Sequence, residues 1–315
     1  MKKSLLLLNF LLAAAFLHAQ YFEVGAVTGT SNYIGDLSDQ RISTEHFNGL
    51  IGLFGRYNAT KHLSIKSSLL KGSISGNDAN ARSSDRRERN LSFRSDILEF
   101  SVTSEVNLTP YNIRDNKTGV PYFFTGLAVF HFNPQAQMRG AWYNLHPLKT
   151  EGRSYSRTSV AIPFGLGMKF NLSYKLNVGL EVGARKTFTD YLDDVSTYYP
   201  DVVGLRSVAP MTASLAYRTP ELTGEFGRNP VGSERGNANN KDWYFFAGLT
   251  VSVNLTDKYG LDFDPQYEVF KEHLKKPKKE KEEKVSKRKK SVKFQQRLRN
   301  LKKKEMEPQV KRRTH

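Results

Sequence analysis

The sequence predicts an all-β fold: an eight-stranded antiparallel transmembrane β-barrel with long extracellular loops, short periplasmic turns and a basic C-terminal tail. Three observations predict it. Eight stretches of roughly ten residues alternate apolar with polar side chains, the period of a strand with two different faces. The connections between these stretches alternate long and short, as in outer-membrane barrels. The chain also opens on a secretory signal.

Residues 1–19 read as a signal peptide. Lys2 and Lys3 precede an apolar run from Leu5 to Phe16, and Ala19 supplies a small residue at the cleavage point. That run is too short to span a membrane, and no later stretch holds 18 consecutive apolar residues. The sequence contains no cysteine, which excludes disulfides, lipoprotein processing and thiolate metal sites.

The clearest strand lies in the stretch from Asn177 to Asp194, where apolar residues alternate with glycines and charges. In a soluble sandwich the apolar face would pack into a core. In a small membrane barrel it faces lipid, and the charges face a closed lumen. The predicted strands are Tyr21–Gly29, Gly49–Tyr57, one that starts at Leu63, Phe93–Leu108, Tyr122–Phe132, Val160–Phe170, Asn177–Arg185 and Trp243–Leu255.

The pattern leaves the register of one strand and the hydrogen bonding of another undecided. Tyr122–Phe132 is apolar on both faces, so the pattern leaves its register ambiguous. Pro163 cannot donate to a ladder, and it predicts a bulge or a missing ladder bond in the sixth strand. A soluble sandwich with charged outer faces stays the alternative to the barrel, although the signal peptide and the alternation of loop lengths argue against it.

The connections predict the orientation. The long ones should be extracellular and the short ones periplasmic. The barrel then covers residues 20–256, and residues 257–315 form a periplasmic tail. The long connections are Ser31–His46, Gly76–Asn90, Asn133–Arg157 and Thr189–Lys241, the last with a short helix near Val208–Tyr217; the short ones are Asn58–His62, Pro110–Pro121 and Asn171–Lys175.

Charged residues on the lumen-facing side predict a sealed interior. Eight strands leave a space that side chains can fill, and buried charges must be paired. Four acids match four bases, so we expect salt bridges and no water-filled pore. The predicted lumen charge network is Glu23, Arg56, Lys66, Glu99, Glu105, Lys169, Glu181 and Arg185.

Other candidate chemistry is weak. The acidic run Asp190–Asp194 could bind calcium, but its spacing matches no EF-hand, and hydrogen bonding to neighbouring amides is the favoured interpretation. His46, His131 and His146 could reach the outer rim, yet none lies in a nucleophile motif. The sequence therefore predicts no enzyme activity, no cofactor and no metal site.

The tail holds the basic character of the chain. From Lys271 to His315 there are 20 Lys and Arg against 6 Asp and Glu, a net +14 of the whole chain's +17. Secretion argues against nucleic acid as partner. The spacing of its apolar residues predicts a short amphipathic helix for a partner or an anionic surface, with a solvated disordered tail as the alternative. The candidate partner-binding residues are Lys275, Lys276, Lys278, Lys279, Lys287, Arg288, Lys289, Lys290, Phe294, Leu298 and Leu301.

Several motifs resemble the PorG-like outer-membrane proteins of Bacteroidota, in order and over Tyr21 to Leu255. They are Asn32–Asp36, Arg89–Phe93, Phe132–Ala136, Pro147–Gly152, Ile162–Gly165, Thr187–Val195, Arg235–Asn237 and Asp242–Tyr244. The resemblance does not include the basic tail. It implies a component of the type IX secretion system, which also supports gliding motility in relatives. The implied partners are the periplasmic ring proteins PorK and PorN, or GldK and GldN in gliding relatives.

Two functions follow as expectations. In the first, the barrel sits in the lipids of the outer membrane and anchors or positions the periplasmic ring, with its tail on an acidic protein surface, peptidoglycan or the inner leaflet. In the second, the barrel acts through its extracellular loops as an adhesin, a ligand binder or a surface enzyme. A diffusion pore conflicts with paired lumen charges.

Overall fold

A computed structural model describes residues 21–38, 47–111, 119–173, 175–227, 229–255 and 286–302. The predicted signal peptide and most of the predicted tail lie outside these residues. The chain divides into two units, one up to Asp262 and one from Phe263 onward, and each is described by itself.

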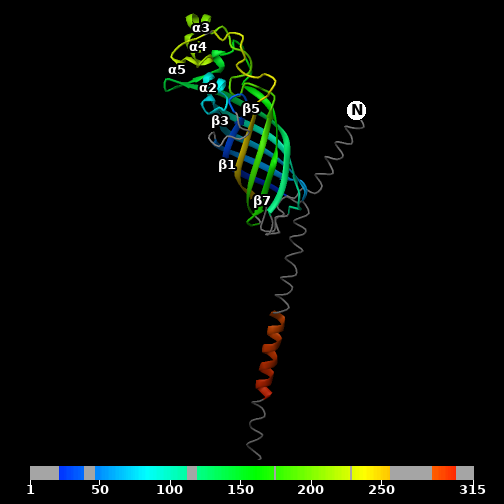
Figure 1. Ribbon diagram of the computed structural model, residues 1–315. Coiled ribbons are helices and arrows are strands. Elements are labelled where there is room, and N and C mark those ends of the chain that lie inside the picture. The colour runs from blue at the N-terminus through cyan, green and yellow to red at the C-terminus, as the bar shows by residue number, and fades with distance from the viewer. Residues whose placement is uncertain are drawn as a thin grey trace, which may run out of the picture. The chain divides into compact units, whose positions relative to one another are not determined.

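Eight antiparallel strands close into a barrel, as the sequence predicted (Figure 1). Every strand pairs with its neighbour along the chain, and the last strand pairs with the first, so that the barrel has no free edge. The strands are β1 Tyr21–Ile34, β2 Asn48–Asn58, β3 Leu63–Asn77, β4 Ser92–Asn107, β5 Gly119–Met138, β7 Thr158–Asn171, β8 Leu176–Thr187 and β9 Trp243–Asn254.

Several strands run further toward the long-loop end than the sequence pattern indicated. The end of β5, predicted to be loop, forms a hairpin with β6 (Ala141–Asn144), which pairs only with β5. Arg139 and Gly140 form its two-residue turn with positive φ angles of 51° and 82°. Pro134, Ala136 and Met138 alternate with Asn133, Gln135 and Gln137 in this extension, but a proline and three amide side chains favoured a loop in the sequence.

The two faces of each strand confirm the predicted alternation. On β4, Leu98, Phe100 and Val102 point outward and are 50%, 52% and 45% exposed, whereas Glu99 is fully buried inside the barrel. The other strands repeat this arrangement. A water-soluble protein rarely exposes so large a continuous apolar surface, but a barrel in hydrocarbon requires one. The soluble sandwich is excluded, because the apolar rows do not pack against a second sheet.

The structure resolves the register of β5. Tyr122, Phe124 and Phe130 point into the barrel, while Phe123 and Leu127 point outward. Both faces are apolar because Phe130 packs in the outer half of the lumen, while Tyr122 and Phe124 lie against the lumen cations Lys169 and Lys66. The β5–β7 ladder is interrupted opposite Pro163, between the pairs Thr125–Phe164 and Ala128–Ala161. The register is the same on both sides of this gap, so the proline causes a missing ladder segment and no bulge.

The outer half of the lumen is an apolar core. It joins inward side chains such as Ile97, Phe130 and Phe246 to loop residues such as Leu37 and Leu192. This core was not predicted. Short helices cap the same end (Figure 1), and α4 confirms the helix predicted in the longest loop. They are η2 Asp78–Asn80, α2 Ser84–Arg89, η3 His146–Leu148, α3 Val202–Val208, α4 Pro210–Ala216 and α5 Pro220–Thr223. In the described parts of the chain, no helix is long and apolar enough to cross a membrane.

The lipid-facing surface makes a depth-dependent prediction. Leu180, 51% exposed near the middle of β8, faces outward opposite Leu249. Leu180→Arg should lower the free energy of unfolding from lipid vesicles by about 2–4 kcal/mol, because an arginine at the bilayer midplane is poorly solvated. Leu108→Arg, at the exposed residue just beyond β4, should cost only about 0–1 kcal/mol. Equal costs in urea titrations would contradict a bilayer around this surface.

Candidate functional site

Glu105 is the centre of an ion-pair network in the half of the lumen near the short turns. Its side chain is fully buried and contacts three cations from three strands. Arg56 Nε lies at 2.8 Å, Lys169 Nζ at 2.6 Å and Lys66 Nζ at 3.8 Å. Alternation along β2, β3, β4 and β7 turns these side chains inward, and closure of the barrel brings them together.

Glu23 shares Arg56 with Glu105. The Arg56 Nη1 atom lies 2.7 Å from Glu23 Oε2. The same carboxylate accepts hydrogen bonds from Asn58 Nδ2 at 2.7 Å, from the Tyr111 hydroxyl at 3.0 Å and from Ser252 Oγ at 3.0 Å. Each oxygen therefore has two partners, which offsets the cost of removing the charge from water.

The remaining predicted charges form two more pairs. Arg185 Nε lies 3.2 Å from Glu99 Oε2, and Lys66 pairs with Glu181. Tyr244 donates to Glu99 at 2.8 Å and Tyr122 donates to Glu181 at 2.9 Å. All eight predicted lumen residues thus lie in ion pairs. Sequence reasoning missed the tyrosines that complete the network, although their inward positions next to charges in the alternation could have indicated them.

One small cavity lies among these pairs. A cavity of about 20 Å³ lies between Lys66, Glu181 and Arg185. One water needs about 10–15 Å³ by this measure, so the cavity holds about one molecule. Cations and aromatic rings pack against each other around this cavity. The Arg185 guanidinium lies 4.4 Å from the Phe246 ring centre, and Lys169 Nζ lies 4.5 Å from the Tyr122 ring centre.

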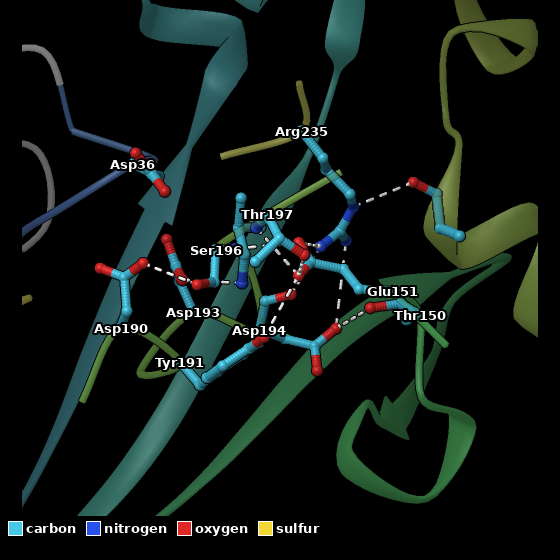
Figure 2. Close-up of polar contacts among 12 residues, drawn as sticks. Asp36, Thr150, Glu151, Asp190, Tyr191, Asp193, Asp194, Ser196, Thr197 and Arg235 are labelled. Carbon is cyan, nitrogen blue, oxygen red and sulfur yellow. Dashed lines mark hydrogen bonds and ion pairs between the residues drawn. The ribbon is translucent and has the colours of Figure 1, made fainter. Parts of the chain in front are cut away.

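A second buried network ties the outer loops together (Figure 2). Arg235 donates to Glu151 Oε1 at 3.0 Å and to the carbonyls of Asp194 at 2.6 Å and Ala216 at 3.3 Å. Glu151 in turn accepts from the Ser196 and Thr197 amides at 2.9 and 3.0 Å. One arginine thereby holds two long loops in a fixed arrangement.

Arg89 makes the corresponding connection for the first two long loops. Its guanidinium binds both oxygens of buried Asp78, at 2.7 and 2.8 Å, and donates to the Asp36 carbonyl at 2.9 Å. A two-point arginine–carboxylate pair of this kind fixes orientation as well as charge. All four long connections therefore contribute to one ordered cap over the barrel.

The acidic run after β8 engages in hydrogen bonds. Asp193 Oδ1 accepts from the Val195 amide at 2.9 Å, Asp190 Oδ2 from Ser196 Oγ at 2.7 Å, and Asp194 from the Tyr155 hydroxyl at 2.6 Å. Burial raises the pKa of Asp190 to about 7 and that of Asp194 to about 6. Among the described residues, no three acidic or histidine side chains converge as a metal site would require.

Two of the candidate histidines, His131 and His146, lie in the described residues. His131 Nδ1 faces Thr158 Oγ1 at 3.1 Å on an exposed strand position, and His146 Nε2 lies 2.9 Å from the Tyr155 carbonyl. A ring nitrogen facing a carbonyl must carry the proton and cannot act as a base there. His46 lies outside the described residues.

Two clefts open at the outer cap. One, of about 630 Å³, is lined by Asp36, Arg86, Arg89 and Asn237 among others, and the second, of about 440 Å³, by Arg139, Arg206 and Phe226. Tyr217 lines both. Their sizes suit small ligands, but their walls mix both signs of charge and specify no ligand class.

The described part of the tail is a helix over residues 286–302. It carries eight Lys and Arg and no acid. Phe294, Leu298 and Leu301 share one face at helical spacing and are 63%, 39% and 60% exposed. Lys287, Arg288, Lys289 and Lys290 occupy its first turns. The other candidate tail residues, Lys275, Lys276, Lys278 and Lys279, lie outside the described residues.

The lumen network predicts a large stability effect. Glu105→Gln should lower the free energy of unfolding by about 3–5 kcal/mol. Arg56 and Lys169 would stay charged and buried after losing the carboxylate that they share. The control is Asp96→Asn, whose surface pair with Arg94 spans 3.7 Å between half-exposed side chains and should cost about 0–1 kcal/mol. Urea unfolding in vesicles measures both, and a small Glu105 effect would contradict a dry lumen.

The filled lumen also predicts an electrical result. Purified chain inserted into planar bilayers should give no stable conductance, since the cavity between the lumen charges admits about one water. Glu105→Gln with Arg56→Gln removes one pair and tests whether the seal depends on it. A steady single-channel current in the unchanged protein would contradict the sealed interior.

Comparison with known proteins identifies a family. Similar solved structures are the N-terminal β-barrel domain of Pseudomonas aeruginosa OprF (11% identity, 75% of this chain and 98% of that chain, TM-score 0.33), Ail, the attachment invasion locus protein of Yersinia pestis (10%, 75%, 99%, 0.34), and Neisserial surface protein A (7%, 74%, 96%, 0.35). No curated protein matches the sequence. Residues 2–209 match a domain of unknown function, and the chain therefore belongs to the DUF6089 family.

Proposed function

We propose that this chain is an outer-membrane barrel, closed to diffusion, that anchors or positions the periplasmic ring of a type IX secretion machinery, and that it is not an enzyme. One observation carries the proposal most directly. The barrel pairs an apolar outer surface with a lumen filled by ion pairs, so it provides a membrane anchor and no passage.

The topology of the barrel supports a periplasmic role for the tail. The end of β9 pairs with the start of β1, at the end of the barrel where the short turns lie. The chain therefore leaves the barrel on that side, which is periplasmic in outer-membrane barrels. The tail helix then offers positive charge on all sides and a narrow apolar stripe, which suits an acidic groove in a protein partner.

The specific machinery is inferred from the resemblance of the motifs to PorG-like proteins. Several of these motifs meet in the outer cap. Arg235, from the Arg235–Asn237 motif, binds Glu151 of the Pro147–Gly152 motif and the backbone of Asp194 in the Thr187–Val195 motif. The motifs therefore serve cap architecture in this chain, and the partner proteins of the PorK and PorN or GldK and GldN type are expected at the other end.

The alternative function, through the extracellular loops, has one specific observation in its favour. The cap is ordered and carries two clefts that share Tyr217. An adhesin, a ligand binder or a surface enzyme would use this face. This alternative predicts that deletions in the extracellular loops abolish a surface phenotype, such as adhesion or ligand binding, and that deletion of the tail leaves it unchanged.

Affinity purification from solubilised envelopes separates the two proposals. The full-length chain should recover the ring lipoproteins, and deletion of residues 271–315 should reduce that recovery at least tenfold, because the charged and apolar tail contacts would be lost. A charge-preserving variant with Phe294, Leu298 and Leu301 changed to serine tests the apolar stripe separately. Deletion of residues 198–233 from the cap is the matched control and should leave recovery unchanged.

Two results would count against the anchoring role. One is recovery of no ring protein by the full-length chain. The other is unchanged secretion in a tail-deleted strain together with loss of a surface phenotype in the loop-deleted strain, which would support the alternative function.

A further inference from the structure

Three segments of the outer cap meet at one phenol. Tyr33 stands near the end of β1, Asp193 follows β8, and Asp242 precedes β9; each is 1% exposed. The Tyr33 hydroxyl donates to Asp193 Oδ2 at 2.5 Å, and its oxygen lies 3.1 Å from Asp242 Oδ1. The two aspartates bracket the longest loop, so their joint attachment to Tyr33 closes the base of that loop.

This geometry requires an extra proton. A phenol carries one hydrogen and can donate it to only one of the two carboxylates. The other carboxylate oxygen then faces the phenol oxygen, which is favourable only if a proton lies between them. The second oxygens of both groups are already engaged, because Asp193 Oδ1 accepts from the Val195 amide and Asp242 Oδ2 from the Leu192 amide, each at 2.9 Å.

The surrounding charges are mostly negative. Asp36 comes from the segment after β1 and Asp190 from the segment after β8. The positive charges of Arg86 and Arg89 in α2 attract Asp36, and the charge of Arg89 also attracts Asp193. Lys241 acts on Asp190. In the described part of the chain no ion pair reaches Asp190, Asp193 or Asp242, and Asp190 Oδ1 is buried with no hydrogen-bond partner.

These surroundings favour the protonated form. Burial, then the charge of Asp36, raises the pKa of Asp193 well above its usual value. Burial, then Asp193, does the same for the pKa of Asp242. The backbone also approaches closely, since a Cβ at Gly35 would collide with both Tyr33 and Asp242.

We propose that Tyr33, Asp193 and Asp242 form a proton-held latch, in which a retained proton keeps both ends of the longest outer loop closed on β1. When the proton leaves, two neighbouring carboxylates become charged without a cation in direct contact with either, and the loop ends separate. The latch makes the order of the outer cap depend on external pH, and it does not rest on the anchoring role.

The sign of the pH dependence follows from linkage. An aspartate has an ordinary pKa of 3.8, and the folded-state values here are higher. A raised folded pKa gives stability that is fully present below the unfolded pKa and is lost as the pH rises through the folded pKa. The latch should therefore be closed in acid and should weaken toward neutral and alkaline pH.

Amide hydrogen exchange on the full chain in lipid vesicles tests the latch between pH 5.5 and 8.5. After correction for intrinsic exchange rates, exchange in residues 189–197 and 235–242 should increase by up to about tenfold per pH unit, because opening releases a proton. Asp242→Asn carries a permanent donor toward Tyr33 and should reduce this slope, most clearly in residues 235–242, because Asp190, whose pKa is about 7, still contributes in residues 189–197. Glu225→Gln, an exposed acid in the same loop, should keep it.

A flat profile in the unchanged protein would overturn the latch, as would an Asp242→Asn profile as steep as the original. If Asp242→Asn fails to fold, as judged by its strand circular dichroism, Asp193→Asn provides the same amide donor from the other side. Its slope should also be reduced, and a slope as steep as that of the unchanged protein would equally refute the shared proton.

Discussion

Mutual neutralisation of charge in a dry lumen is the constraint on which the barrel depends. Four carboxylates and four cations face one another where water cannot enter, and each would be costly alone. Glu105 has the most central position because it contacts three cations, and Arg56 and Lys66 each join it to a second carboxylate. Tyrosine hydroxyls and Asn58 donate the remaining hydrogen bonds to the carboxylates, so that the buried charges are stabilised without solvent.

Much of this arrangement follows from a period of two. Once the apolar face is assigned to lipid, the alternation places residues such as Glu23, Lys66 and Arg185 inside the barrel. The interior of an eight-stranded barrel is narrow enough that these side chains must contact one another. The sequence did not predict which acid pairs with which base, because the register between distant strands decides that. Lys66, for instance, pairs with Glu181 across the lumen as well as with Glu105 on the neighbouring strand β4.

The parts that escaped sequence reasoning are those whose signal is not periodic. The inner face of β9 carries Phe246 where a polar face was expected, and β5, whose register the pattern left ambiguous, turns Phe130 inward, because the outer half of the lumen is filled as an ordinary apolar core. The β6 hairpin depends on backbone pairing and a two-residue turn. The outer cap depends on contacts of Arg89 and Arg235 over long sequence separations, which one sequence without a structure does not reveal.

The molecule thus has two buried polar networks with different electrostatic character, separated by the apolar core. The lumen network is balanced, and each carboxylate has a cation within an ion pair. The cap network is acid-rich around Asp190, Asp193 and Asp242, where hydrogen bonds take the place of cations. A balanced network stabilises over a wide pH range, whereas an acid-rich one retains protons and responds to pH. Anchorage in the bilayer can therefore stay constant while the order of the outer cap changes.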